Sequence, residues 1–145
     1  MKIADIMSRD VDSIRLDTPL TEAAKKMSEH DIGSLPVTDG QKIHGMLTDR
    51  DIVVRALAKG KDPAKTTARE AMTEKICYVF DDQDISEAAE SMKDQQIRRL
   101  VVLNRDKRLV GFVSMGDLSR KSNDEHLTAT VARSCAEPSA QHAAF

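Results

Sequence analysis

The segment GMLTDRD at residues 45–51 recurs, with substitutions, as GFVSMGD at residues 111–117. In both copies a short apolar run ends in a hydroxyl residue, Thr48 or Ser114, and an aspartate follows three positions later. The apolar run predicts a buried strand, and the hydroxyl residue with the later acid predicts a helix that starts directly after it. The recurrence indicates that the chain holds two copies of one structural unit.

The match extends on both sides of this segment. Earlier positions repeat at a spacing of 65, and from Gly45 onward the spacing is 66, because the second copy has one extra residue in a loop. The matched pairs are Met7/Met72, Asp17/Asp82, Glu22/Glu87, Ala23/Ala88, Ala24/Ala89, Met27/Met92, Ile32/Ile97, Leu35/Leu100, Val37/Val102, Gly45/Gly111, Thr48/Ser114 and Asp51/Asp117. We therefore expect a first repeat at residues 1–60, a linker at 61–67, a second repeat at 68–122, and a C-terminal helix and mobile tail at 123–145, with the helix over residues 124–132.

Each repeat is predicted to run strand, helix, strand, strand, helix. Extended segments open the repeats at residues 11–16 and 76–80, hairpins pair residues 34–38 with 43–48 and 99–103 with 109–114, and final helices cover 49–58 and 115–121. The first helix of each repeat shows the i, i+3, i+4, i+7 spacing of one buried face. Its apolar residues are Leu20, Ala23, Ala24 and Met27 in one copy and Ile85, Ala88, Ala89 and Met92 in the other.

A unit of about 55 residues buries too little surface to be stable by itself. We therefore predict an α+β (α/β) fold in which two β-α-β-β-α repeats pack sheet to sheet about a pseudo-two-fold axis. Met27, Met46, Met92 and Met115 are expected to fill the core rather than to bind a cofactor.

Composition limits the classes of partner. The 145 residues are 40% apolar and 32% charged, with a formal net charge of −2. This balance argues against binding to nucleic acid or to an anionic membrane, and no apolar run approaches the roughly 20 residues of a membrane span. Two cysteines, Cys77 and Cys135, are too few for a disulfide scaffold, so we expect a cytoplasmic protein.

The recurring hydroxyl–acid pair has two compatible interpretations. Thr48 with Asp51, and Ser114 with Asp117, have the spacing of capping boxes, which only start a helix. The same arrangement suits a phosphorylated sugar: backbone N–H groups at the helix start attract phosphate, the hydroxyl can bond a phosphate oxygen, and the carboxylate can accept both ribose hydroxyls.

The doubled motif resembles the cystathionine-β-synthase (CBS) domain, and the pair resembles a Bateman module. The resemblance lies in Gly-x-x-Thr/Ser-x-x-Asp, in GMLTDRDIVV at residues 45–54, and in SLPV at 34–37 with RLVV at 99–102, and it covers roughly residues 3–121. The chain is similar to small bacterial proteins that consist only of a CBS pair. The resemblance implies a regulatory sensor of AMP, ADP, ATP or a related adenosyl compound such as S-adenosylmethionine.

The resemblance also implies which residues line two clefts between the repeats. One cleft would use Thr48, Arg50 and Asp51, with Thr73, Cys77 and Arg98 nearby; the other would use Ser114, Gly116, Asp117 and Arg99, with Ser8, Val11 and Gly33 nearby. Arg99 matches a position that meets phosphate in a kinase regulatory subunit of the family. Its counterpart in the first repeat is Ser34, so that cleft lacks a phosphate clamp unless Arg50 compensates.

Plainer interpretations stay open for several of these residues. Arg98 and Arg99 could be a solvated pair ahead of a strand, Asp49-Arg50-Asp51 could be only a charged helix start, and Cys77 could be a buried thiol. No catalytic motif or metal-ligand spacing is present, so we expect neither an enzyme, a metal site nor a required cofactor. We expect the final helices to form a homodimer, and we expect a separate effector protein to respond to the ligand. The alternatives are a ligand-free dimerisation module and, less in keeping with the residues, a fragment of an enzyme.

Overall fold

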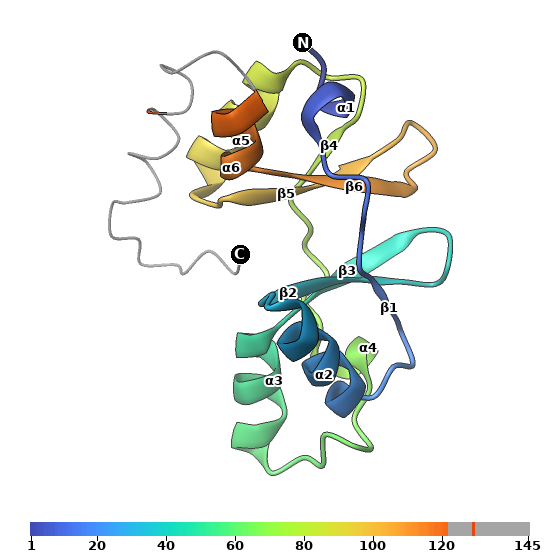
Figure 1. Cartoon of the computed structure of the whole chain (residues 1–145). Helices are drawn as coiled ribbons and strands as arrows, with labels where there is room; N and C mark the ends of the chain where they lie inside the picture. Colours follow the sequence, from blue (N-terminus) through green and yellow to red (C-terminus); the bar gives the residue numbers. More distant parts are fainter. Residues whose placement is uncertain (122–128, 130–145) are drawn as a thin grey trace. The chain divides into compact units, whose positions relative to one another are not determined.

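The computed structural model describes residues 1–121 and Ala129, so the C-terminal helix expected at 124–132 lies, except for Ala129, outside the described residues. The chain forms two compact units (Figure 1). The Thr48 unit is Asp12–Ile76, and the Ser114 unit combines Met1–Val11 with the described residues from Cys77 to Lys121. Each unit is described below by itself.

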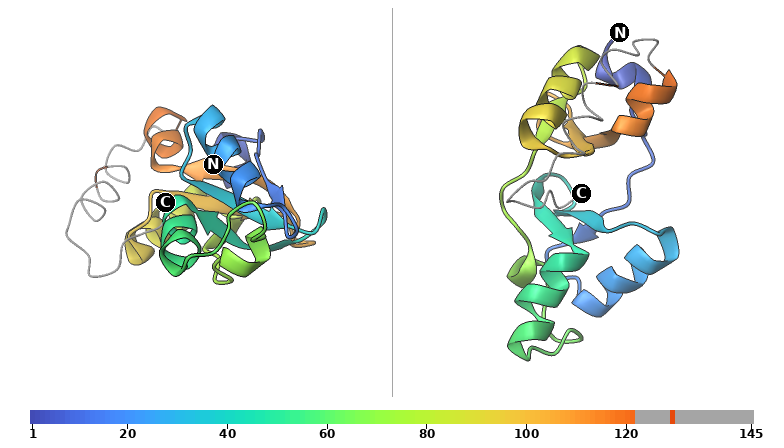
Figure 2. Two further views of the ribbon diagram at one scale, coloured as in Figure 1. Left: turned by 90° about the horizontal axis from the view of Figure 1, so that it is seen from below. Right: turned by 90° about the vertical axis from the view of Figure 1, so that its left-hand side faces the viewer.

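The Thr48 unit is a three-stranded sheet with its helices. In chain order it contains β1 (Ile14–Arg15), α2 (Leu20–His30), β2 (Ser34–Thr38), β3 (Ile43–Thr48), α3 (Asp49–Arg55), η1 (Leu57–Lys59) and α4 (Ala68–Ala71). The strand order is β1-β2-β3, with β1 parallel and β3 antiparallel to β2. The helices lie on one face of this sheet (Figures 1 and 2).

The Ser114 unit has the same architecture. It contains α1 (Ile3–Ile6), β4 (Tyr78–Phe80), α5 (Ile85–Gln95), β5 (Arg99–Leu103), β6 (Leu109–Ser114) and α6 (Met115–Lys121). The order is β4-β5-β6, again with one parallel and one antiparallel pairing. The mixed α and β fold and the strand–helix–strand–strand–helix order of each repeat are therefore confirmed. The opening strands are shorter than expected, and the helix expected at 49–58 is interrupted after Arg55.

Two short helices that the sequence did not predict change which segments pack together. Helix α1 opens the first repeat but belongs to the Ser114 unit, and α4 opens the second repeat but belongs to the Thr48 unit. Ser8 pairs with Phe112 of β6 through N–H···O bonds of 2.7 and 2.9 Å, and Thr73 pairs with Met46 of β3 through two bonds of 2.9 Å. The compact units are thus not the repeats of the sequence, because each takes its opening segment from the other repeat.

Glycines permit this exchange. A Cβ on Gly111 would lie 2.5 Å from the carbonyl oxygen of Ser8, and a Cβ on Gly45 would lie 2.6 Å from that of Thr73. Both distances are far below van der Waals contact. The glycine that begins each GxxT/SxxD motif therefore makes room for the backbone of the exchanged segment.

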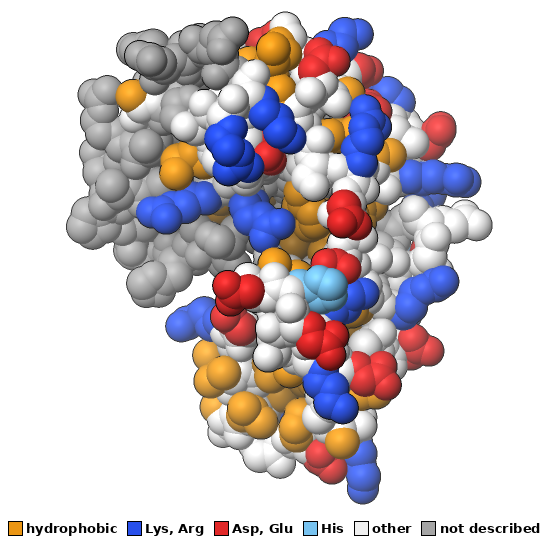
Figure 3. Space-filling view, in the orientation of Figure 1, with side chains coloured by type: hydrophobic (Ala, Val, Ile, Leu, Met, Phe, Trp, Pro, Cys, Tyr) orange, Lys and Arg blue, Asp and Glu red, His pale blue; other side chains and the backbone are white. Residues whose placement is uncertain are grey.

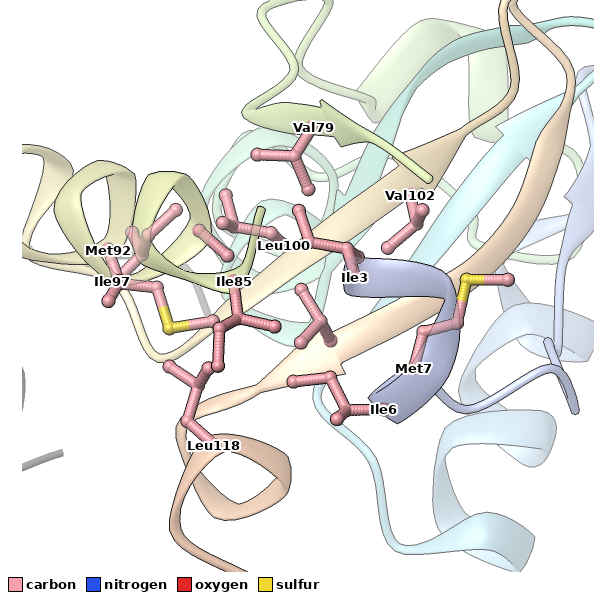
Figure 4. Packing of buried hydrophobic residues seen from close by; sticks show 13 residues of the cluster. Ile3, Ile6, Met7, Val79, Ile85, Met92, Ile97, Leu100, Val102 and Leu118 are labelled. Atoms are coloured by element: carbon pink, nitrogen blue, oxygen red, sulfur yellow. The ribbon is translucent and has the colours of Figure 1, made fainter. Parts of the chain in front are cut away.

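Each unit has its own hydrophobic core. In the Ser114 unit, side chains of α1, α5, β5 and α6 converge on one cluster (Figure 4). Met27, Met46 and Met92 are buried and Met115 is half-buried against this cluster, so the expectation that these methionines fill the core is confirmed. Ala24 is exposed, which makes its assignment to the buried face of α2 wrong; its counterpart Ala89 is buried.

The helices found among the described residues are too short or too polar to cross a membrane.

Candidate functional site

Each hydroxyl–acid pair forms a reciprocal capping box. Thr48 ends β3; its backbone N–H donates to Asp51 Oδ2 at 3.0 Å, and the Asp51 N–H donates to Thr48 Oγ1 at 3.0 Å. In the Ser114 unit the corresponding bonds join Ser114 and Asp117 at 2.9 and 3.1 Å. The capping interpretation is therefore confirmed at both positions. The cap also places the two carboxylates identically, in the first turn of the helix that follows β3 or β6.

Both carboxylates are buried, and in each only one of the two oxygens makes a short hydrogen bond. Asp51 is 8% exposed and Asp117 is 6% exposed. Oδ2 of each is held by the cap, while Oδ1 makes longer contacts: 3.4 Å to Thr73 Oγ1 at Asp51, and 3.3 Å to the guanidinium of Arg120 at Asp117. An O–H···O bond from a sugar hydroxyl is shorter, about 2.7–2.8 Å. Oδ1 is therefore the atom of each site that can exchange its present contact for a ribose hydroxyl.

The helix starts differ between the units. At α3 the N–H groups of Asp49, Arg50 and Asp51 already donate to Gly33 O (3.0 Å), Asp49 Oδ1 (2.8 Å) and Thr48 Oγ1 (3.0 Å). The N–H groups expected to attract phosphate at the start of α3 are therefore already engaged, in part because the Asp49 carboxylate folds back onto its own helix start.

At α6, Met115 N–H donates to Arg98 O at 2.8 Å and Asp117 N–H donates to Ser114 Oγ. Within the part of the chain that the structure describes, no acceptor is recorded for the Gly116 N–H. The first backbone N–H groups of α6 therefore have fewer acceptors among the described residues than those of α3.

The structure divides the predicted site residues between the units. The Thr48 unit holds Gly33, Thr48, Arg50, Asp51 and Thr73; the Ser114 unit holds Ser8, Val11, Cys77, Arg98, Arg99, Ser114, Gly116 and Asp117. Thr73 lies in contact with Asp51, and Ser8 pairs with Phe112 of β6, two residues before Ser114. The predicted places of Cys77 and Arg98 beside the Thr48 pair, and of Gly33 beside the Ser114 pair, would join residues of different units and stay predictions.

Some predicted residues have a local structural role. The carbonyl of Gly33 accepts a hydrogen bond from the first N–H of α3, and the carbonyl of Arg98 accepts one from the first N–H of α6. Cys77 is half-buried against the core of the Ser114 unit, with Sγ 3.9 Å from Gln95 Oε1. Its interpretation as a packed thiol is therefore the one supported by its surroundings.

Arg99 lies on the same sheet face as the Ser114 pair. Arg99 and Ser114 are directly opposed in the β5–β6 register, and the Arg99 guanidinium lies 4.9 Å from the centre of the Phe112 ring. Lys and Arg side chains gather over α6 and the start of β5 (Figure 3). Arg99 is half-buried, so it is not merely one of a solvated pair, whereas Arg98 is exposed.

Three basic residues near the carboxylates were missed from the sequence. Arg55 and Lys121 each follow their aspartate by four residues and lie 3.7 Å from its Oδ1. Arg55 also donates to Met72 O at 2.9 Å, and Lys121 donates to Ile6 O at 2.9 Å. Each therefore links a site carboxylate to the exchanged short helix. The i, i+4 spacing, present in both repeats, was the signal that could have found them.

Arg120 is the third of these residues, and it has no basic counterpart in the other unit. Its guanidinium contacts Asp117 Oδ1, and a Cβ on Gly116 would lie 2.9 Å from its Nη1. Glycine at position 116 therefore leaves room for an arginine beside the carboxylate. Among residues 1–121 the structure shows no group of three or more His, Cys, Asp or Glu side chains that could hold a metal ion.

The chain belongs to the CBS domain family. The family's sequence profile matches twice, at residues 3–57 and 68–124, as expected for a tandem pair. Hypoxic response protein 1 of Mycobacterium tuberculosis is 41% identical over 132 residues, which cover 90% of this chain and 92% of the relative.

Solved structures agree with this assignment. The crystal structure of Hypoxic Response Protein I with two coordinated zinc ions is similar with a TM-score of 0.74 and 43% identity, over 83% of this chain and 98% of that one. The CBS pair of protein MJ0100, solved in complex with 5′-methylthioadenosine and S-adenosyl-L-methionine, is similar with a TM-score of 0.68 and 30% identity, over 83% and 98% of the two chains. The predicted family and the mixed α and β fold of the repeats are therefore confirmed.

Proposed function

We propose that this chain is a regulatory module that binds adenosine compounds at two sites. The Thr48 site is centred on Thr48 and Asp51, and the Ser114 site on Ser114 and Asp117. The observation that carries the proposal is the duplicated buried carboxylate, with one oxygen fixed by the cap and the other in an exchangeable contact. The complex of the MJ0100 pair with two adenosyl compounds supports the same ligand class here.

In this proposal the aspartate selects the sugar. A ribose presents two neighbouring hydroxyls, and a carboxylate with no proton accepts from both. The cap holds each carboxylate in one orientation before the ligand arrives, so little side-chain entropy is lost on binding. The hydroxyl of Thr48 or Ser114 lies at the same strand end and is placed for a polar group of the ligand.

The module acts by differential binding rather than by catalysis. A ligand that binds one conformation more tightly raises the population of that conformation. The link from Asp51 through Arg55 to α4, and from Asp117 through Lys121 to α1, provides a path by which an occupied carboxylate alters the exchanged segments. We propose that a separate effector protein in the cytoplasm responds to this change, and that the module acts as a homodimer.

The experiment is a calorimetric titration of the full chain with AMP, ADP, ATP, S-adenosylmethionine and 5′-methylthioadenosine. Guanosine monophosphate is the matched control, because it keeps the ribose phosphate and changes the base. We expect saturable binding of at least one adenosine compound, and a loss of at least tenfold in affinity when both Asp51→Asn and Asp117→Asn are present. An absence of binding by all five compounds, or equal binding by the double variant, would refute the proposal.

One observation favours the alternative of a ligand-free dimerisation module. Val53, Val54 and Leu57 of α3 and η1 are 54%, 43% and 52% exposed, and hydrophobic side chains are visible over α3 in Figure 3. Exposed apolar groups of this kind favour contact with another protein surface, here a second copy. Sedimentation of the wild type and of Val54→Lys tests this. The alternative would be favoured if the dimer dissociates in the variant and the wild type binds none of the five compounds.

A further inference from the structure

The two sites differ in charge although their backbones match. Equivalent positions are assigned by the repeat, and two pairs of contacts support the assignment. Gly33 O and Arg98 O accept from the first helical N–H of α3 and α6, at 3.0 and 2.8 Å. Ser34 opposes Thr48 in the register as Arg99 opposes Ser114. Positions 33, 34, 49, 50, 51, 54 and 55 of the Thr48 unit therefore correspond to 98, 99, 115, 116, 117, 120 and 121 of the Ser114 unit.

At these seven positions the Thr48 site is neutral. Its charged residues are Asp49, Arg50, Asp51 and Arg55, two acidic and two basic. The Ser114 site has one acidic residue, Asp117, and four basic residues, Arg98, Arg99, Arg120 and Lys121, which gives a formal charge of +3. An anionic ligand group is therefore attracted to one site and not to the other.

The Thr48 site also carries its own anion. The Asp49 carboxylate accepts from the Arg50 N–H at 2.8 Å and lies so close to Gly33 that a Cβ there would be 3.2 Å from Oδ2. The counterpart of Asp49 in the other unit is Met115, which has no charge. A phosphate brought to the Thr48 site would meet this carboxylate, and like charges at short range repel.

The Ser114 site instead has basic side chains beside its carboxylate, Arg120 and Lys121, and a further one, Arg99, opposite Ser114 in the sheet. Arg99 lies on the sheet face that carries Ser114, and Arg120 contacts the Asp117 oxygen through which a ribose would be held. Arg120 is a largely exposed side chain, so its guanidinium can leave Asp117 Oδ1 without unpacking the core. Guanidinium groups match the oxygens of a phosphate and form strong, charge-assisted hydrogen bonds with them.

We infer that phosphate recognition is confined to the Ser114 site, which takes adenosine 5′-phosphates, whereas the Thr48 site takes adenosine compounds without a phosphate. This inference rests on the proposed function, since both sites must first bind adenosine. Arg99 and Arg120 are the residues that determine the specificity of the Ser114 site. The Thr48 site lacks that specificity because the counterparts of Arg99 and Arg120 there are Ser34 and Val54, which carry no charge.

The experiment uses full-length variants with one site disabled at a time. Asp51→Asn leaves the Ser114 site, and Asp117→Asn leaves the Thr48 site. Asparagine keeps the shape of aspartate and an oxygen that accepts the capping N–H, but it loses the charge that receives the ribose. Each variant is titrated calorimetrically with AMP and with adenosine at low salt, where electrostatic contributions are least screened.

We expect Asp51→Asn to bind AMP at least tenfold more tightly than adenosine, and Asp117→Asn to bind the two within about threefold of each other. Adding Arg99→Gln or Arg120→Gln to Asp51→Asn should reduce the AMP preference several-fold. Arg108→Gln is the matched control, because Arg108 is an exposed arginine next to the opposite end of β6 from Ser114. It should leave the preference unchanged.

Two failures can be told apart. If adenosine binds but both single-site variants prefer AMP equally, or if the Arg99 and Arg120 variants keep the full preference, the charge argument is wrong and the proposed function stands. If the wild type binds neither adenosine nor AMP, the proposed function for these ligands fails and the inference fails with it.

Discussion

Substitution of Gly111 by alanine tests the exchange of opening segments that separates the compact units from the sequence repeats. The new Cβ would lie 2.5 Å from Ser8 O and 2.9 Å from the Met7 sulfur, whereas ordinary contact begins at about 3.4 Å. The nearer atom belongs to the backbone and cannot rotate away. The segment at Ser8 would therefore have to move by almost 1 Å, out of its pairing with Phe112.

The cost follows from the contacts that are lost. Two backbone hydrogen bonds, of 2.7 and 2.9 Å, join Ser8 and Phe112, and each contributes about 1 kcal/mol net. Crowding of the Met7 sulfur adds an overpacking cost of roughly 1–3 kcal/mol. We expect Gly111→Ala to lower the free energy of unfolding by about 3–5 kcal/mol, measured by urea denaturation followed by circular dichroism. Gly45→Ala should act similarly in the Thr48 unit, where the clash is with Thr73 O at 2.6 Å.

Gly116→Ala is the matched control in the same unit. Its new Cβ would meet Nη1 of Arg120 at 2.9 Å, but that atom is the end of a flexible, exposed side chain. Alanine also favours a helix over glycine by up to about 1 kcal/mol. Gly116→Ala should therefore be neutral or slightly stabilising. A Gly111→Ala protein as stable as Gly116→Ala would refute the close approach of the exchanged segment.

Three further outcomes are expected. Asp117→Ala should lower the free energy of unfolding by about 1 kcal/mol through loss of the cap, and Asp117→Asn should not; equal urea midpoints for the two would contradict this. Two Arg105 hydrogen bonds of 2.8 Å hold the pKa of Asp82 below its ordinary value. That contribution to stability is present above the ordinary carboxyl pKa and is lost as pH falls through the lowered one, so Arg105→Gln should raise the pKa of Asp82 in an NMR titration and leave that of Asp84 in place. Lys121→Met should increase hydrogen exchange at the amides of α1, because its ammonium holds the carbonyl at the end of that helix at 2.9 Å; unchanged exchange would show that α1 is held by its apolar contacts alone.

Much of the local structure could be predicted from the sequence. The two hairpins, at residues 34–48 and 99–114, and the start of α3 and of α6 agree with the structure, because short apolar runs and capping boxes act between neighbours in the chain. The paired motif also identified Thr48, Asp51, Ser114 and Asp117 as the centre of each candidate site. Their side chains meet for a local reason, since a cap joins residues only three positions apart.

The amino-acid sequence by itself thus determined the repeat, the order of its elements and the hydroxyl–acid pairs. Only the tertiary structure decided that α1 and α4 pack on the other repeat's sheet, because two copies with the same periodicity offer the same apolar surface to either segment. It also decided that Asp49 occupies the start of α3, that Ala24 is exposed, and that Arg120 lies beside Asp117. These features depend on side-chain direction and on contacts between distant segments, and a one-dimensional pattern carries neither.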